Sequence, residues 1–397
     1  MTRGPYNAPA NIRGVQRGAL VVGIVFMAVL AVGFFTNRTQ FVRSYLFAFT
    51  FWAGLSIGSL ALLMLQHLTG GGWGLVIRRV LEASTRTLPL ILILFVPILL
   101  GAHRIYGWTD PAEIASHPVL AEKAKYLNLG FFTVRAAIYF AIWLALAFFL
   151  NRWSLLQDRT ADRQYTKKMR VLSGPGMVLL IFTVTFASID WFMSLDWEWS
   201  STIYGFVFVA AWSLSALAFT IAALAWLSKH EPMNEVVAQL HFHDLGKLLL
   251  ALVMLWTYFA FSQFLIIWSG NLPEEIRWYL PRTHGAWGAI ALVVVVLHFA
   301  FPFLFLLSRS FKRNANKLVI VAILILVMRL IDLFWVLAPN FTHEHFSVSL
   351  LDLAAPIGMG GLWLATFTWA LQQRALIPIN DPLYETVLEQ KHAHAGH

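Results

Sequence analysis

Long apolar segments separated by short polar stretches form the dominant pattern along this chain of 397 residues. A helix needs about 20 consecutive apolar residues to cross the hydrocarbon core of a bilayer. Ten segments approach or exceed that length: residues 18–36, 44–66, 87–108, 127–150, 175–195, 203–227, 247–269, 286–308, 317–338 and 350–371. The pattern therefore predicts an all-α, polytopic membrane protein with about ten transmembrane helices.

The composition supports this class and limits the chemistry. Apolar residues make up 59% of the chain and charged residues only 12%, a balance that a soluble domain of this length could not solvate. The absence of cysteine excludes thiolate zinc sites, iron–sulfur clusters and covalently attached c-type haem. The candidate haem ligands His67, His103 and His298 lie on different segments. No metal is expected in this chain, so any redox centres would belong to partner proteins.

The basic residues predict the orientation of the chain in the membrane. The net charge is +9, but no basic run alternates with aromatic residues as in a nucleic-acid site. The N-terminal arm, the even-numbered loops and the C-terminal tail hold 20 of the 29 lysines and arginines, against 7 in the odd-numbered loops. The positive-inside rule then places both termini in the cytoplasm. The most basic loop, 151–170, is expected to anchor the chain at the inner leaflet.

Three local features refine the prediction. Residues 70–86 mix apolar side chains with Arg78, Arg79 and Arg86, as in a short amphipathic helix that lies at the inner interface. Gly54 and Gly58 form a pair of small residues four positions apart, which permits two helices to approach closely. Prolines at positions 97 and 302 lie inside spans and should kink them.

The chain also shows an internal repeat. Residues 189–195 and 331–337 both read I-D-x-F-x-x-L at the end of a span that runs outward. An aspartate at matching depth predicts that spans 2–5 are duplicated as spans 6–9. We therefore expect two four-helix bundles, at 44–202 and 203–349. They would be flanked by an N-terminal arm and first helix at 1–43 and by a last helix and tail at 350–397.

The ionisable residues of the first bundle are candidates for a quinone site or a proton path, since charges within a membrane are rare. Asp190 lies near the outer end of its span, and Arg135 and Tyr139 lie on the preceding span. An Asp190–Arg135 pair could act in proton exchange, or it could be a structural ion pair. His103 and Arg104 end the third span near the outer surface, where a neutral histidine could accept a proton from a quinol.

The second bundle offers a parallel set of proton-path candidates. Arg329 and Asp332 share one helix face and could neutralise each other in place. The other candidates are His298, Gln263, Asp244 and Lys247. Asp244 and Lys247 lie at the inner start of the seventh span, where Asp244 could cap the helix or form the mouth of a proton path. Each of these residues could instead be a hydrogen-bonded packing residue.

Two outer segments could dock a partner protein. Residues 196–199 read D-W-E-W, and residues 340–345 carry one glutamate and two histidines. Tryptophan is also common at membrane interfaces as an anchor, so the pattern alone does not decide between the two roles.

Four strings resemble one family of membrane subunits. GGGWGLVIRRVLEASTRTLPL (70–90), PILLGAHRIYGW (97–108) and SIDWFMSLDWEWSSTIYG (188–205) resemble subunits of the NrfD or polysulfide-reductase type. HFHDLGKLLLALVMLWTYFAFSQFLIIWSGNLPEE (241–275) is similar to the ActF-type subunit of alternative complex III. The resemblance covers roughly spans 2 to 9.

The resemblance implies a fold of ten helices with two four-helix bundles and a place in the bacterial inner membrane. It also implies partners: a sister NrfD-like membrane subunit, an iron–sulfur subunit and c-type cytochrome subunits, besides lipids. Haem c and iron–sulfur clusters would lie in those partners. A quinone such as menaquinone would bind near the outer surface, at a site that the family usually assigns to the sister subunit, with this type as a second quinone-associated subunit. Asp190, Arg135 and His103 occupy the first-bundle positions where such a site would lie.

The sequence leaves three functions open. The first is an integral subunit of a quinol:cytochrome c (or oxidase-linked) oxidoreductase, with a quinone-facing pocket, a proton-conducting path or both, and no redox cofactor of its own. The second is a secondary transporter built on repeats, and the third is a structural scaffold of the complex. Whether the chain itself takes part in catalysis is not decided by its residues.

Overall fold

The computed structural model describes residues 6–342 and 346–395, without the side chains of residues 390 and 392–395. Ten helical stretches in the described part are long and apolar enough to cross a membrane, which confirms the predicted class of all-α, polytopic membrane protein. Their helices are α1 (Ile12–Thr36), α2 (Arg38–Thr69), α3 (Gly72–Thr85) followed by α4 (Leu88–Gly101), α7 (Leu129–Thr160), α8 (Gln164–Trp191), α9 (Tyr204–Leu227), α11 (Gln239–Gly270), α14 (Gly285–Val293) continued by the π-helical segment η4 (Val294–Ala300) and α15 (Phe301–Leu307), α17 (Ala315–Leu337) and α19 (Leu350–Gln372).

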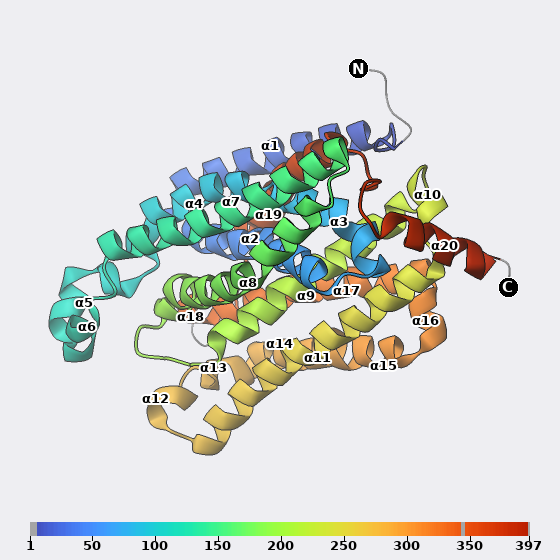
Figure 1. The fold of residues 1–397 in the computed structure, drawn as a ribbon. Coiled ribbons are helices and arrows are strands. Elements are labelled where there is room, and N and C mark those ends of the chain that lie inside the picture. The colour runs from blue at the N-terminus through green and yellow to red at the C-terminus, as the bar shows by residue number, and fades with distance from the viewer. Residues whose placement is uncertain (1–5, 343–345, 396–397) are drawn as a thin grey trace.

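Short helices connect these spans at the two ends of the molecule (Figure 1). One end holds the start of α1 together with α10 (Met233–Val236), α16 (Arg309–Arg313) and α20 (Tyr384–Ala395); we call it the terminal end. The other, distal end holds α5 (Pro111–Ser116), α6 (Pro118–Lys123), α12 (Pro273–Ile276), α13 (Leu280–Thr283) and α18 (Pro339–Thr342). The chain therefore begins and finishes at the same end, as ten spans require.

Asparagine side chains fix where several of the long helices begin. Asn37 accepts a hydrogen bond from the backbone of Gln40 at the start of α2, and Asn128 does the same for α7. Asn314 caps α17 in the same way. Each cap satisfies one of the N–H groups that the first helical turn leaves without a partner.

The helices α2 and α9 form the centre of the molecule. They pack along each other, and 94% of the apolar window of α2 is buried, against 17% for α1. Glycine permits this contact, because a Cβ atom at Gly58 would lie 2.1 Å from the carbonyl oxygen of Trp212 and one at Gly54 would meet the Trp212 ring. The small-residue contact predicted for Gly54 and Gly58 is confirmed.

The packing order of residues 44–202 recurs in residues 203–349. In the first set, α2 packs on α4 and α8, and α7 packs on α8. In the second set, α9 packs on α11 and α17, and η4 packs on α17. Between the sets, α8 contacts α9 and α17 contacts α2. A duplication predicts this arrangement, while α1 and α19 pack mainly on each other beside α2.

The structure differs from the sequence prediction in two places. Residues 151–170 are mostly helical rather than a loop, because α7 continues to Thr160 and α8 begins at Gln164. Helix α3 is present, but residues 74–85 are all buried within the protein, so the expectation of a helix lying on the surface is wrong. Its charged face is neutralised by other charged side chains instead of by water.

Candidate functional site

The first polar site surrounds Asp190 in the last turn of α8. Arg135 on α7 donates two hydrogen bonds to its carboxylate, from Nε to Oδ2 at 2.8 Å and from Nη2 to Oδ1 at 2.9 Å. The hydroxyls of Tyr139 and Tyr126 donate to the same oxygens at 2.7 Å and 3.0 Å. Asp190 is fully buried, so four donors replace the water that would otherwise solvate its charge. The predicted contact between Asp190 and Arg135 is confirmed.

The guanidinium of Arg135 is equally well satisfied. Its Nη1 donates to the carbonyl of Tyr126 at 2.9 Å, and its carbon lies 3.8 Å from the ring centre of Tyr126 and 4.4 Å from that of Phe131. Tyr126 lies just before α7, and burial together with the charge of Asp190 raises its pKa to about 12, against an opposing effect of Arg135. Tyr126 therefore stays protonated and donates to Asp190 at physiological pH. Every polar side-chain atom of Asp190 and Arg135 has a partner within the protein, and we call such a site closed.

His103 and Arg104 do not join this site. Both side chains are exposed, in the turn η1 (Ala102–Arg104) at the distal end. The buried neighbour is Tyr106, whose hydroxyl donates to the carbonyl of Trp191 at 2.9 Å. The structure thus brings together Asp190, Arg135 and Tyr139 but leaves His103 and Arg104 at the surface.

The second polar site contains buried atoms without partners. Arg329 and Asp332 form an ion pair one turn apart on α17, and the ring of His298 lies 4.1 Å from that of Trp256, centre to centre. Within the described residues, both ring nitrogens of His298, Nε of Arg329 and Nε1 of Trp256 are buried and have no hydrogen-bond partner. Native proteins normally satisfy such groups with internal water.

The backbone around His298 explains why it lies there. Pro302 has no N–H to donate and its ring clashes with the carbonyl four residues earlier, which is that of His298. The helix widens accordingly: Val294–Ala300 is π-helical, and the N–H of Phe301 reaches the carbonyl of Val296. π-helical turns occur often at functional sites. The sequence predicted a break in helix geometry at Pro302, and the structure shows a π-helical segment just before it that packs on α17.

Two more buried polar side chains lie between this site and the distal end. Tyr204, at the start of α9, is buried with its ring centre 5.5 Å from that of Trp199. Arg282 is buried and stacks on Trp278, with its guanidinium carbon 3.7 Å from the ring centre. No carboxylate forms an ion pair with Arg282 in the part of the chain that the structure describes, although Asp196 lies within electrostatic reach of it.

Gln263 has a well-defined place in this half of the molecule. Its side chain is buried, donates to the hydroxyl of Tyr279 at 3.1 Å and accepts from the hydroxyl of Ser201 at 2.9 Å. It therefore links α11 to the distal loops on either side. Tyr258, on the same helix, is 64% exposed and faces away from the protein.

At the terminal end of α11, Asp244 and Lys247 pair with each other at 3.0 Å on an exposed surface. The expectation that Asp244 caps the helix is wrong, because α11 already begins at Gln239. The cap is instead His241, whose Nδ1 accepts from the backbone N–H of Ala238 at 3.0 Å.

A buried charge network at the terminal end was not predicted from the sequence. Its members come from α3, from α7 and from the segments that follow α19: Arg78, Arg79, Glu82, Ser154, Gln157, Asp158, Arg374 and Asp381. Glu82 is its centre. It accepts hydrogen bonds from Arg78 at 3.0 Å, from Arg79 at 2.7 Å and from Arg374 at 3.0 Å.

This network joins distant parts of the chain. Arg79 also binds Asp158 on α7, with distances of 2.6 Å and 2.5 Å to its two oxygens, and Arg78 binds Asp381 at 2.6 Å. Three arginines thus face three carboxylates. The spacing of Arg78 and Arg79 before Glu82, four and three residues, was a readable signal of pairing along one helix face.

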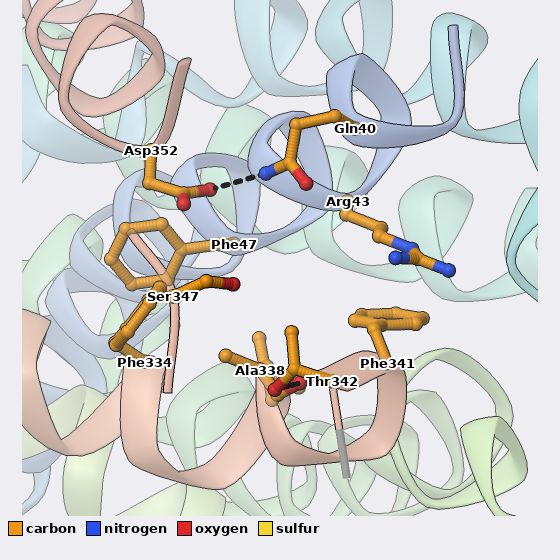
Figure 2. Close-up of a pocket in the computed structure, with 10 residues that line it drawn as sticks. Gln40, Arg43, Phe47, Phe334, Ala338, Phe341, Thr342, Ser347 and Asp352 are labelled. Carbon is orange, nitrogen blue, oxygen red and sulfur yellow. Dashed lines mark hydrogen bonds between the residues drawn. The ribbon is translucent and has the colours of Figure 1, made fainter. Parts of the chain in front are cut away.

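A pocket opens at the distal end where α2, α17, α18 and α19 meet (Figure 2). Its charged and amide side chains are Gln40, Arg43 and Asp352, and Phe341 forms part of its wall. Asp352 accepts from Ser44 at 2.6 Å and from Gln40 at 3.1 Å. The guanidinium carbon of Arg43 lies 4.8 Å from the ring centre of Phe341, and its Nε is buried without a partner among the described residues. None of these residues was a candidate from the sequence.

The distal surface segment 196–199 is built into the protein rather than free. Trp199 is buried and stacks on Trp278 with ring centres 4.7 Å apart, while Asp196 and Glu198 both pair with Arg277. In the other predicted docking segment, residues 343–345 lie outside the described part of the chain.

No protein-family model matches this chain, and no curated protein is found to be related to it. The resemblance to the NrfD and ActF subunits therefore stays a prediction from the sequence strings quoted above. The structure itself establishes the all-helical membrane fold and the geometry of its polar sites.

Proposed function

We propose that this chain is an integral membrane subunit of a quinol-oxidising respiratory complex and that it conducts protons through the second polar site. The complex would be a quinol:cytochrome c (or oxidase-linked) oxidoreductase of the bacterial inner membrane, with both termini of this chain in the cytoplasm. Haem c and iron–sulfur centres would lie in the cytochrome and iron–sulfur subunits. A sister membrane subunit would lie beside this one.

The burial and the missing hydrogen-bond partners of His298 are the main support for a proton path. His298 is completely buried, both of its ring nitrogens lack a partner among the described residues, and it lies in a π-helical turn. An imidazole can accept a proton on one nitrogen and release one from the other, which suits a relay. The neighbouring Arg329 and Asp332 supply a charge pair, and Tyr204 and Arg282 are further buried polar side chains on the way to the distal end.

The pocket of Figure 2 supports the quinone-facing part of the proposal. It combines aromatic walls with a cation and a carboxylate, the mixture that a ring carrying two oxygen substituents requires. Asp190 and Arg135 suit this role less well, because every polar atom of that pair already has a partner. A quinol head group would thus contact Arg43, whose Nε has no partner among the described residues, rather than Asp190.

A structural scaffold is the second candidate, and the closed Asp190 site favours it for the first bundle. An ion pair with five hydrogen bonds and aromatic faces fixes the register of α7 against α8 without needing a ligand. The two proposals differ at the second polar site: a proton path requires His298, whereas a scaffold does not.

Purification through a tag on this chain tests membership of the complex. In a mild detergent, we expect c-type haem bands in the visible spectrum and iron–sulfur and cytochrome subunits by mass spectrometry. A colourless preparation of this chain alone would reject the respiratory complex and favour the transporter.

The proton path is tested in the purified complex, reconstituted in liposomes with a pH-sensitive dye. We expect His298→Leu to assemble fully and to lower the number of protons moved per quinol oxidised. Tyr258→Phe on the exposed face of α11 is the matched control and should leave this ratio unchanged. An unchanged ratio in His298→Leu would reject the path.

A further inference from the structure

A cluster of basic side chains lies at the terminal end, between the start of α11 and the short helix α16. Lys312 and Arg313 come from α16, and His243 and Lys247 come from α11. The two helices pack directly on each other. The cluster takes no part in the proton path proposed above, so its function must be argued separately.

Close packing builds this cluster into the protein. Lys312 is 7% exposed and His243 is 9% exposed. Gly246 makes room for the lysine, because a Cβ atom at that position would lie 2.7 Å from Cγ of Lys312. The aliphatic part of Lys312 therefore lies against the backbone of α11.

The charges of the cluster are not balanced within the described part of the chain. Lys247 pairs with Asp244. The charged side chains near His243 in the described part of the chain are one carboxylate, Asp244, and three cations, Lys247, Lys312 and Arg313. Nδ1 of His243 and Nε of Arg313 are buried without a hydrogen-bond partner. Burial and the nearby Lys247 also lower the pKa of Lys312, as expected for a cation that lacks an anion.

The surroundings indicate which kind of anion fits. The cluster lies at the end of two spans whose outward faces are apolar, with Leu304 and Leu307 on α15 and Leu255 on α11 exposed. A lipid can place its acyl chains along these side chains while its phosphate reaches the cations. Basic pockets between spans at one membrane surface bind anionic lipid head groups in this way.

We infer that Lys312, Arg313 and His243 form a binding site for the phosphate of an anionic phospholipid at the terminal end of α11 and α16. The site recognises the phosphate by charge and the acyl chains by the apolar faces of α11 and α15. A free phosphate ion would satisfy the cations but not the apolar faces, so the two sources can be told apart.

The test uses the full-length protein, stripped of lipid in an uncharged detergent, and native mass spectrometry of the bound states. Phosphatidylglycerol is titrated against phosphatidylcholine with the same acyl chains, and inorganic phosphate is titrated separately. We expect phosphatidylglycerol to bind at least tenfold more tightly than phosphatidylcholine. Equal binding of the two lipids, or binding of inorganic phosphate as tight as that of phosphatidylglycerol, would overturn the inference.

Variants locate the site. Lys312→Met keeps the stem against Gly246 and should lose the tenfold preference, whereas Lys317→Met, on the exposed side of the next helix, should keep it within twofold. If Lys312→Met does not fold, Arg313→Gln provides the same test. A preference that survives both Lys312→Met and Arg313→Gln would show that the anionic lipid binds elsewhere.

Discussion

Replacing Asp190 by asparagine is the sharpest test of the first polar site. The carboxylate accepts four hydrogen bonds, two from Arg135 and one each from Tyr139 and Tyr126. An asparagine offers one acceptor oxygen and one NH₂ group. Its NH₂ group would therefore face an N–H donor of Arg135 without forming a hydrogen bond. If its nitrogen replaces Oδ2, it faces Nε of Arg135, which cannot accept a hydrogen bond.

The expected cost follows from what remains around Arg135. Removing one partner of a buried ion pair typically costs about 3–5 kcal/mol. Arg135 keeps the carbonyl and the ring of Tyr126 and the ring of Phe131, and cation–π contacts contribute roughly 0.5–2 kcal/mol each. We therefore expect Asp190→Asn to lower the free energy of unfolding by about 3 kcal/mol, at the lower end of that range.

The assay is equilibrium unfolding in mixed micelles, followed by tryptophan fluorescence, with a double-mutant cycle. Asp190→Leu with Arg135→Met removes both charges, and it should cost clearly less than the sum of the two single variants. A loss below about 1 kcal/mol for Asp190→Asn, or additive effects in the cycle, would refute the view that this pair is a structural clamp.

Further predictions concern other parts of the fold. Glu82→Gln should destabilise the protein by about 3–5 kcal/mol in the same unfolding assay, because it leaves arginines facing a neutral group; a change within 0.5 kcal/mol, about that of a surface substitution, would contradict the network. Gly58→Ala should cost about 1–3 kcal/mol through overpacking against Trp212, whereas Gly174→Ala, with nothing within 4 Å, should not destabilise; equal melting temperatures would contradict this. Tyr126→Phe should lose about 1 kcal/mol at pH 8. Since the pKa of Tyr126 is raised to about 12 in the folded state, its contribution is complete below the unfolded value near 10 and is lost toward pH 12. The difference in melting temperature between the wild type and Tyr126→Phe should therefore shrink between pH 8 and pH 11. A constant difference would refute a raised pKa for Tyr126.

The fold could be predicted from the sequence to a large extent because membrane spans are read from one property. Apolar length identified all ten spans, but it misplaced their ends where helices continue through polar residues, as at α7 and α8. The same rule misread α3, because its charges meet partners from α7 and from the segment after α19, which are remote in sequence. Hydropathy cannot show that a charge is neutralised by a distant residue.

The candidate sites were predictable only where a pair is local or lies on adjacent spans. Arg329 with Asp332 is a single-turn pair, and Arg135 with Asp190 joins neighbouring helices, so depth and spacing sufficed. The isolation of His298 depends on a π-helical turn and on Trp256 from another helix. The pocket around Arg43 depends on the approach of α17 and α19 to the start of α2. Neither arrangement leaves a sequence pattern.

We propose that the aspartates of the two I-D-x-F-x-x-L segments have different functions: Asp190 holds the structure and Asp332 belongs to a proton path. The most direct measurement is the number of protons moved per quinol oxidised by the reconstituted complex that contains Asp332→Asn. We expect normal assembly and electron transfer with a lowered proton ratio. An unchanged proton ratio at normal assembly would contradict it.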